Sequence, residues 1–82
     1  MPTIHDKNNN QFILQLQGLE SVLQYRRLED DRIDFYRTYV PPELRAHGHA
    51  AQLVDVGIAW AREQKLNIEA SCWYVAKRLA NA

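Results

Sequence analysis

Apolar and polar residues alternate along the first half of the chain, a pattern typical of strands with one buried face. Apolar side chains take nearly every second position in residues 11–17, Gly18 interrupts the pattern, and it resumes over residues 20–28. Residues 33–40 are rich in β-branched and aromatic side chains, which favour strands. Because short polar segments connect the three runs, we predict three consecutive antiparallel strands.

The second half of the chain changes to helical periodicity. From Ala50 onward, apolar residues recur in steps of three and four, which indicates one face of a helix that ends near Gln64. Residues 66–72 then predict a short strand, and residues 73–79 predict a last helix. The long helix would connect the third and fourth strands as a right-handed crossover, so these two strands would lie parallel. The predicted fold is an α+β domain with the order β-β-β-α-β-α, an antiparallel meander extended by one parallel strand.

The length of 82 residues predicts one small domain. We assign the domain to residues 11–82, because residues 1–10 end in a polar Lys-Asn-Asn-Asn run that is typical of a frayed tail and turn. The N-terminal segment lacks the apolar core of a signal peptide, and no stretch approaches the roughly 20 apolar residues of a membrane helix. We therefore expect a cytoplasmic protein without a membrane partner.

Net charge and cysteine content narrow the range of functions. The formal net charge is zero, which disfavours nucleic acid as the main partner, because binding to phosphates of the backbone needs a basic surface. Cys72 is the single cysteine of the chain, so an intramolecular disulfide is impossible. A zinc cluster cannot be built from one cysteine either, and we predict no metal site.

The segment between the third strand and the long helix is a candidate anion site. The strand ends at Pro41-Pro42, and a short turn with a glycine leads into the helix. The first amides of a helix have no carbonyl partner within it, and the helix dipole adds partial positive charge there. Gly48 lets the backbone approach a bulky anion. We therefore predict a nucleotide-like or pyrophosphate-bearing ligand, held mainly by the main chain of Arg45, Ala46, His47, Gly48, His49 and Ala50.

The same segment resembles a known family. The string Arg45-x-x-Gly48-x-Ala50, between a strand and a helix, is similar to the Q/R-x-x-G-x-G/A acetyl-coenzyme A motif of the GNAT superfamily of N-acetyltransferases. A longer ordered set, which covers about residues 12–79, resembles a subfamily of very short GNAT-like proteins. This set comprises Tyr25, Thr38-x-Val40-Pro41, Arg45-x-x-Gly48-x-Ala50-x-x-Leu53-Val54 and Ser71-Cys72-x-Tyr74-Val75.

The resemblance implies a minimal GNAT fold that binds acetyl-coenzyme A and transfers the acetyl group to an amine, in a small molecule or a protein. It also implies that the pyrophosphate lies on the amides of residues 45–50. The pantetheine arm is expected to pair as an extra strand beside Thr38, Tyr39 and Val40. A coenzyme A thioester is therefore the expected donor substrate, and the acceptor stays open.

Two candidate catalytic residues, Cys72 and Tyr74, lie at the end of the predicted fourth strand and just after it. A thiolate at Cys72 could receive the acetyl group and pass it on, and the alternative is a small buried cysteine. Tyr74 could protonate the leaving thiolate of coenzyme A, and the alternative is a packing residue. Members of the short subfamily usually have histidine where Arg37 stands. The alternative function is therefore a non-catalytic coenzyme A-binding or protein-interaction module, and a homodimer that covers apolar surface such as Trp73 is a further expectation.

Overall fold

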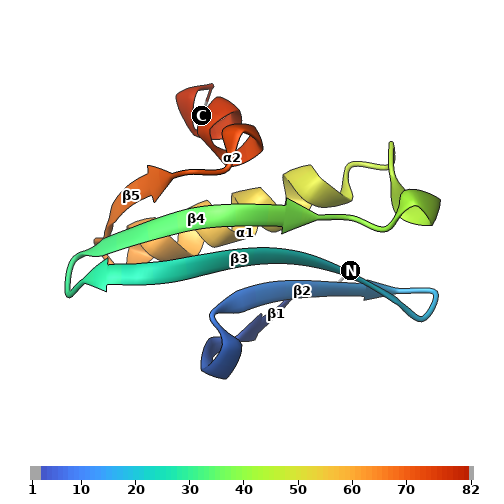
Figure 1. The fold of residues 1–82 in the computed structure, drawn as a ribbon, viewed down its shortest axis with the longest axis horizontal. Helices are drawn as coiled ribbons and strands as arrows, with labels where there is room; N and C mark the ends of the chain where they lie inside the picture. The colour runs from blue at the N-terminus through green and yellow to red at the C-terminus, as the bar shows by residue number, and fades with distance from the viewer. Residues whose placement is uncertain (1–2, 82) are drawn as a thin grey trace.

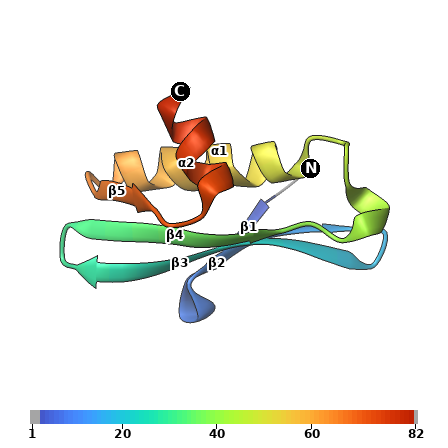
Figure 2. The same cartoon turned by 45° about the horizontal axis from the view of Figure 1, so that its top comes forward.

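The computed structural model describes residues 3–81, which form one mixed sheet with two helices on one face (Figure 1). The strands lie side by side in chain order, the first four antiparallel to their neighbours and the last pair parallel. Figure 2 shows the long helix lying across one face of the sheet. The elements are β1 (Thr3–Asp6), η1 (Lys7–Asn9), β2 (Gln11–Leu16), β3 (Leu19–Glu29), β4 (Arg32–Tyr39), η2 (Pro42–Leu44), α1 (His49–Glu63), β5 (Asn67–Ala70) and α2 (Trp73–Ala80).

This arrangement confirms the predicted α+β fold, the antiparallel meander and the parallel crossover strand. The prediction of a frayed tail over residues 1–10 is wrong for the described part, because Thr3–Asp6 form strand β1 against β2; residues 1–2 lie outside the described residues. His5 fixes β1 in place: its ring stacks on Phe12 with centroids 4.1 Å apart. Its Nε2 also lies 2.7 Å from the Tyr25 hydroxyl.

The hydrophobic core lies between α1 and the sheet. Gly57 lets the helix approach closely, because a Cβ there would lie 2.6 Å from Leu23 Cδ2 and 3.1 Å from Phe35 Cε1. No helix among residues 3–81 is long and apolar enough to cross a membrane. The buried apolar side chains of this core are Phe12, Leu14, Leu23, Tyr25, Ile33, Phe35, Leu53, Val54, Ile58, Ala61 and Val75.

A β-bulge at Tyr36 changes which side chains of β4 face the helix. Gln24 pairs with Arg37, but the next residue of β3, Tyr25, pairs with Phe35, so Tyr36 is an extra residue in β4. Because a strand alternates its side chains between two faces, one extra residue reverses the alternation beyond it. Phe35 is buried beneath α1, whereas Arg37 lies on the opposite face and Thr38 returns to the helix side.

Protonation of His5 should weaken the fold. Burial lowers the pKa of His5 below its ordinary value of 6.5, so the folded state favours the neutral ring, and stability is lost as the pH falls below 6.5 through the lower folded pKa. We expect the melting temperature to drop between about pH 7.5 and pH 5.5. The drop in melting temperature should be smaller in His5→Gln than in the wild type. In the control His47→Gln it should equal that of the wild type. Equal drops in wild type and His5→Gln would contradict this assignment.

Candidate functional site

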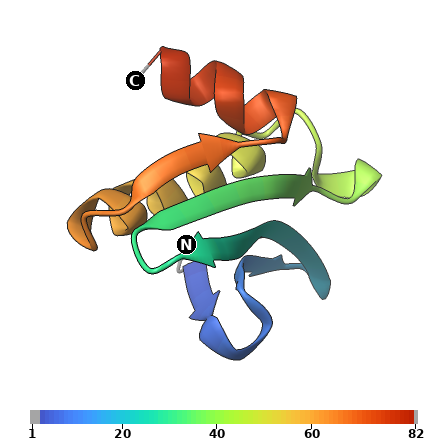
Figure 3. The same cartoon turned by 60° about the vertical axis from the view of Figure 1, so that its left-hand side comes forward.

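Strands β4 and β5 separate beyond Phe35 and Ala70, and a cleft opens between the end of β4 and the start of α2. The last backbone hydrogen bond between the two segments in the described part of the chain runs from the Cys72 amide to the Phe35 carbonyl, at 3.1 Å. Figure 3 shows β5 and α2 turning away from the end of β4. The cleft consists of two adjoining cavities, of about 430 Å³ and 260 Å³, both lined by Val40, Arg45, Ala50 and Tyr74.

A buried carboxylate holds the point at which the strands separate. Asp34 on β4 accepts hydrogen bonds from the amide and the hydroxyl of Ser71, both at 2.8 Å. Arg26 Nε lies 3.6 Å from the same carboxylate, which is almost fully buried. The segment between β5 and α2 is therefore tied to β4 by main-chain and side-chain contacts immediately before Cys72. Neither Asp34 nor Ser71 was predicted as a site residue, although Ser71 belongs to the string that resembles the family.

The 260 Å³ cavity is lined by the N-terminus of α1. Gly48 is the N-cap residue with φ 81°, and no side chain caps the helix. The first helical bond runs from the Gln52 amide to the Gly48 carbonyl, at 3.0 Å. Within residues 3–81 the four amides from Gly48 to Ala51 donate no hydrogen bond. All four residues line the cavity, so the structure offers unpaired donors where the sequence predicts an anion.

The loop before α1 has a strained backbone at Ala46. Its φ is 67°, in the left-handed region, which costs an L-residue about 1–2 kcal/mol. Glycine is the residue that adopts this conformation without strain. Position 46 therefore has a backbone conformation that favours glycine over the alanine of this chain.

The side chains of the predicted loop differ in where they lie. Arg45 lines both cavities of the cleft, and its Nε donates to the Val40 carbonyl at 2.9 Å. His49 is buried and lines the smaller cavity. The exposed His47 side chain lines a separate cavity of about 290 Å³ with Leu16 and Glu43. Of the two loop histidines, only His49 is brought to the cleft.

The 430 Å³ cavity is lined by the Cys72 thiol and the end of β4. Cys72 precedes α2 as its N-cap residue, and its Sγ lies 3.6 Å from the Thr38 hydroxyl oxygen. Desolvation raises the pKa of this thiol. Hydrogen bonds from the Val75 amide, the Thr38 hydroxyl and the amides of Tyr74 and Thr38 outweigh that effect, so the pKa lies below its ordinary value. A lowered pKa increases the thiolate fraction and hence the reactivity of the sulfur near neutral pH.

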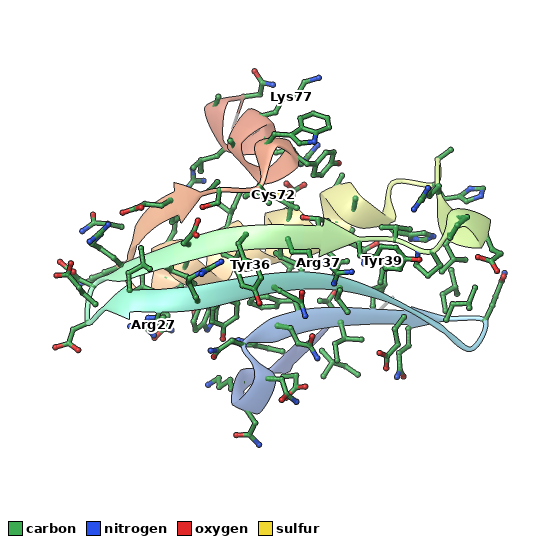
Figure 4. The ribbon with its side chains drawn as sticks, viewed as in Figure 1. Arg27, Tyr36, Arg37, Tyr39, Cys72 and Lys77 are labelled. Carbon is green, nitrogen blue, oxygen red and sulfur yellow. The ribbon has the colours of Figure 1, made fainter. Side chains whose placement is uncertain are left out.

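Tyr74 lines both cavities of the cleft, beside Trp73, whose side chain is 72% exposed. Tyr39 lines the larger cavity together with Thr38 and Val40. The structure therefore brings both predicted catalytic residues and the end of β4 to one cleft. Arg37 lies elsewhere: it donates to Gln24 Oε1 at 3.0 Å on the sheet face turned away from α1 (Figure 4).

Comparisons with known proteins agree with this fold. Residues 11–81 match the GCN5-related N-acetyl-transferase family. The chain belongs to this GNAT family. It is 31% identical over 75 residues to Protein NATD1 of Xenopus tropicalis, which covers 89% of this chain and 69% of that protein. Protein NATD1 of Homo sapiens shows the same identity over the same share of this chain, and over 66% of its own length. The GNAT resemblance of the sequence is thereby confirmed.

Relief of the strain at Ala46 should stabilise this GNAT domain. Ala46→Gly removes a left-handed penalty of about 1–2 kcal/mol and adds roughly 0.5–1 kcal/mol of unfolded-chain entropy. We expect a net gain of about 0.5–1 kcal/mol in the free energy of unfolding, measured by urea denaturation. The control Ala59→Gly, on the exposed face of α1, should lose about 1 kcal/mol. A comparable loss in both variants would contradict the strain.

The Thr38 hydroxyl should make the Cys72 thiol more acidic. In Thr38→Val the lost hydrogen bond raises the thiol pKa, so the pH midpoint of alkylation by iodoacetamide moves upward and the rate near pH 7 falls. Thr38→Ser keeps a hydroxyl and should keep the wild-type midpoint. Identical midpoints in all three proteins would show that this contact does not influence the thiolate.

Proposed function

We propose that the chain binds acetyl-coenzyme A in the cleft between the end of β4 and the start of α2 and transfers the acetyl group to an amine. One observation carries the proposal: a single cleft joins the unpaired amides at the start of α1 to the Cys72 thiol at the start of α2. Amide donors at one end of the cleft and a thiol at the other suit a long thioester, which has a charged diphosphate at one end and a reactive sulfur at the other. Membership of the GNAT family supports the donor.

The diphosphate would lie against the start of α1. The amides of Gly48, His49 and Ala50 can donate to its oxygens, and the helix dipole places partial positive charge there. Arg45 adds a guanidinium at the loop edge and has no carboxylate partner among the described residues. A helix start without a side-chain cap suits an anion supplied by the ligand.

The pantetheine arm would run along β4 beyond Phe35. There β5 no longer pairs with β4, so alternate main-chain groups along Thr38, Tyr39 and Val40 have no strand partner on the cleft side. The amides of an extended ligand can pair with such an edge as an added strand. The thioester would then lie beside Cys72 and Tyr74, which line the same cavity.

The direct route needs two groups from the protein. A main-chain amide near Val40 polarises the thioester carbonyl and stabilises the oxyanion that forms on it. The neutral amine forms a C–N bond to the carbonyl carbon, the C–S bond breaks, and its electron pair goes to the coenzyme sulfur. The Tyr74 hydroxyl or water supplies the proton to that sulfur, and the acetylated nitrogen gives its own proton to solvent.

The covalent route uses the lowered pKa of the Cys72 thiol. Its thiolate attacks the thioester carbonyl, an S–C bond forms to Cys72, the C–S bond of the coenzyme breaks, and the departing coenzyme sulfur takes a proton from Tyr74 or water. The neutral amine then forms a C–N bond to the acetyl carbon, the bond from that carbon to Cys72 breaks with its electron pair on the sulfur, and the acetylated nitrogen gives its proton to solvent. Arg37 cannot act as the base in this route, because a guanidinium keeps its protons. Activation of the thiol therefore comes from Thr38 and the amides at the start of α2.

A second candidate function is binding of coenzyme A thioesters without turnover. One observation favours it: neither cavity of the cleft is lined by an Asp or Glu side chain among the described residues. A protonated amine that enters the cleft must lose its proton before it attacks, and no carboxylate is in place to accept it. Such a chain would serve as a carrier or a protein-interaction module.

Binding and turnover can be measured separately. We expect acetyl-coenzyme A at about 1 mM to raise the melting temperature by several degrees and to give calorimetric heat. Arg45→Ala should weaken binding about tenfold, whereas Arg62→Ala on the exposed side of α1 should not. Thiol release is then followed across a panel of amines and proteins.

The turnover assay distinguishes the covalent route, the direct route and the non-catalytic function. Loss of release in Cys72→Ala supports the covalent route, and loss only in Tyr74→Phe supports the direct route. Binding with no release on any acceptor selects the non-catalytic function. Absence of both a thermal shift and binding heat would overturn the assignment of acetyl-coenzyme A to this cleft.

A further inference from the structure

The sheet face turned away from α1 is covered by no helix within residues 3–81 (Figures 1 and 2). We call it the open face. An apolar row crosses it, because Ile4 pairs with Ile13, Ile13 with Val22, and Val22 with Tyr39. Directly paired residues share one face of a sheet, so the four side chains lie next to each other. Ile4 is 50% exposed and Tyr39 38% exposed, so the ends of the row are open to solvent.

A polar row runs beside the apolar one, through Asp6, Gln11, Gln24 and Arg37. Its hydrogen bonds all point the same way. Arg37 donates to Gln24 at 3.0 Å, Gln24 donates to Gln11 at 3.3 Å, and Gln11 donates to Asp6 at 3.2 Å. The row therefore begins with a guanidinium on β4, ends with a carboxylate on β1, and has only neutral side chains between them.

We propose that two copies of the chain pack with their open faces against each other. The twofold axis lies between the two sheets, runs parallel to the strands and passes over the gap between β2 and β3. This operation places β1 of one copy over β4 of the other. Ile4 then faces Tyr39, Ile13 faces Val22, and each contact occurs twice, as twofold symmetry requires. Sheets that pack face to face in this way bury their apolar rows between them.

Charge complementarity selects a second copy as the occupant. The same axis reverses the polar row, so Asp6 of each copy faces Arg37 of the other, and Gln11 faces Gln24. In the neighbouring row, Gln15 of one copy faces Glu20 of the other. No two like charges meet among these rows. A partner whose surface carries charges of one sign would repel either Asp6 or Arg37. The open face, in contrast, is complementary to a second copy of itself.

The proposal does not depend on acetyl-coenzyme A. The open face lies on the opposite side of the sheet from α1, whose N-terminus lines the cleft. Tyr39 is the residue that belongs to both, since it ends the apolar row and also lines the larger cavity. The dimer would therefore border the cleft without using Cys72 or the start of α1.

Sedimentation equilibrium of the full chain tests the proposal. We expect a dimer with a dissociation constant of about 10 μM. Ile13→Glu should weaken the dimer at least about tenfold by placing a charge in the apolar row. The control Val56→Glu, on the exposed side of α1, should leave it unchanged. Circular dichroism and thermal melts confirm that each variant is folded.

A charge exchange provides the specific readout. Arg37→Asp alone and Asp6→Arg alone should each weaken the dimer, because like charges then face each other across the axis. The double variant Asp6→Arg with Arg37→Asp should restore it. A wild-type chain that stays monomeric at about 500 μM overturns the proposal. So does a dimer that survives Ile13→Glu, or a double variant no stronger than either single one.

Discussion

The separation of β5 from β4 after Phe35 is the constraint on which the site depends. The bond from the Cys72 amide to the Phe35 carbonyl is the last backbone tie between the segments in the described chain, and the buried Asp34 holds Ser71 beside it. Beyond this point β4 keeps an unpaired edge and α2 begins. If the tie slipped by one residue, the edge, the thiol and the start of α2 would move together. The rigidity of the cleft therefore comes from one buried carboxylate and its partners.

Both ends of the cleft use main-chain dipoles where a larger protein could use charged side chains. The start of α1 presents amides to a predicted anion, and the start of α2 lowers the pKa of Cys72. A domain of 82 residues with zero net charge has little space to bury a charged group and to pair it. Helix starts supply partial positive charge at no cost in buried ions. The two helices thus serve both as covering for the sheet and as the electrostatics of the site.

The sequence predicted the fold well because its periodic segments are long and end at clear breakers, such as Gly18 and the prolines before α1. It missed β1, because four residues with one strongly apolar side chain, Ile4, carry no periodic signal. The role of His5 was invisible for a similar reason, since its partners Phe12 and Tyr25 come from two other strands. The loop and Cys72 were predicted as site residues from local strings. The Asp34–Ser71 contact, 37 residues apart in the chain, could not be inferred from spacing.

The bulge at Tyr36 has a consequence for how β4 can vary. The exposed Tyr36 side chain makes an aromatic contact with Arg26, so replacing it would cost little packing. Deleting the residue would be a different event: every later position of the strand would rotate by half a turn. Arg37 would then point at the thiol, and Thr38 would point into solvent. For this strand, the presence of a residue at position 36 therefore affects the cleft more than the type of side chain at that position.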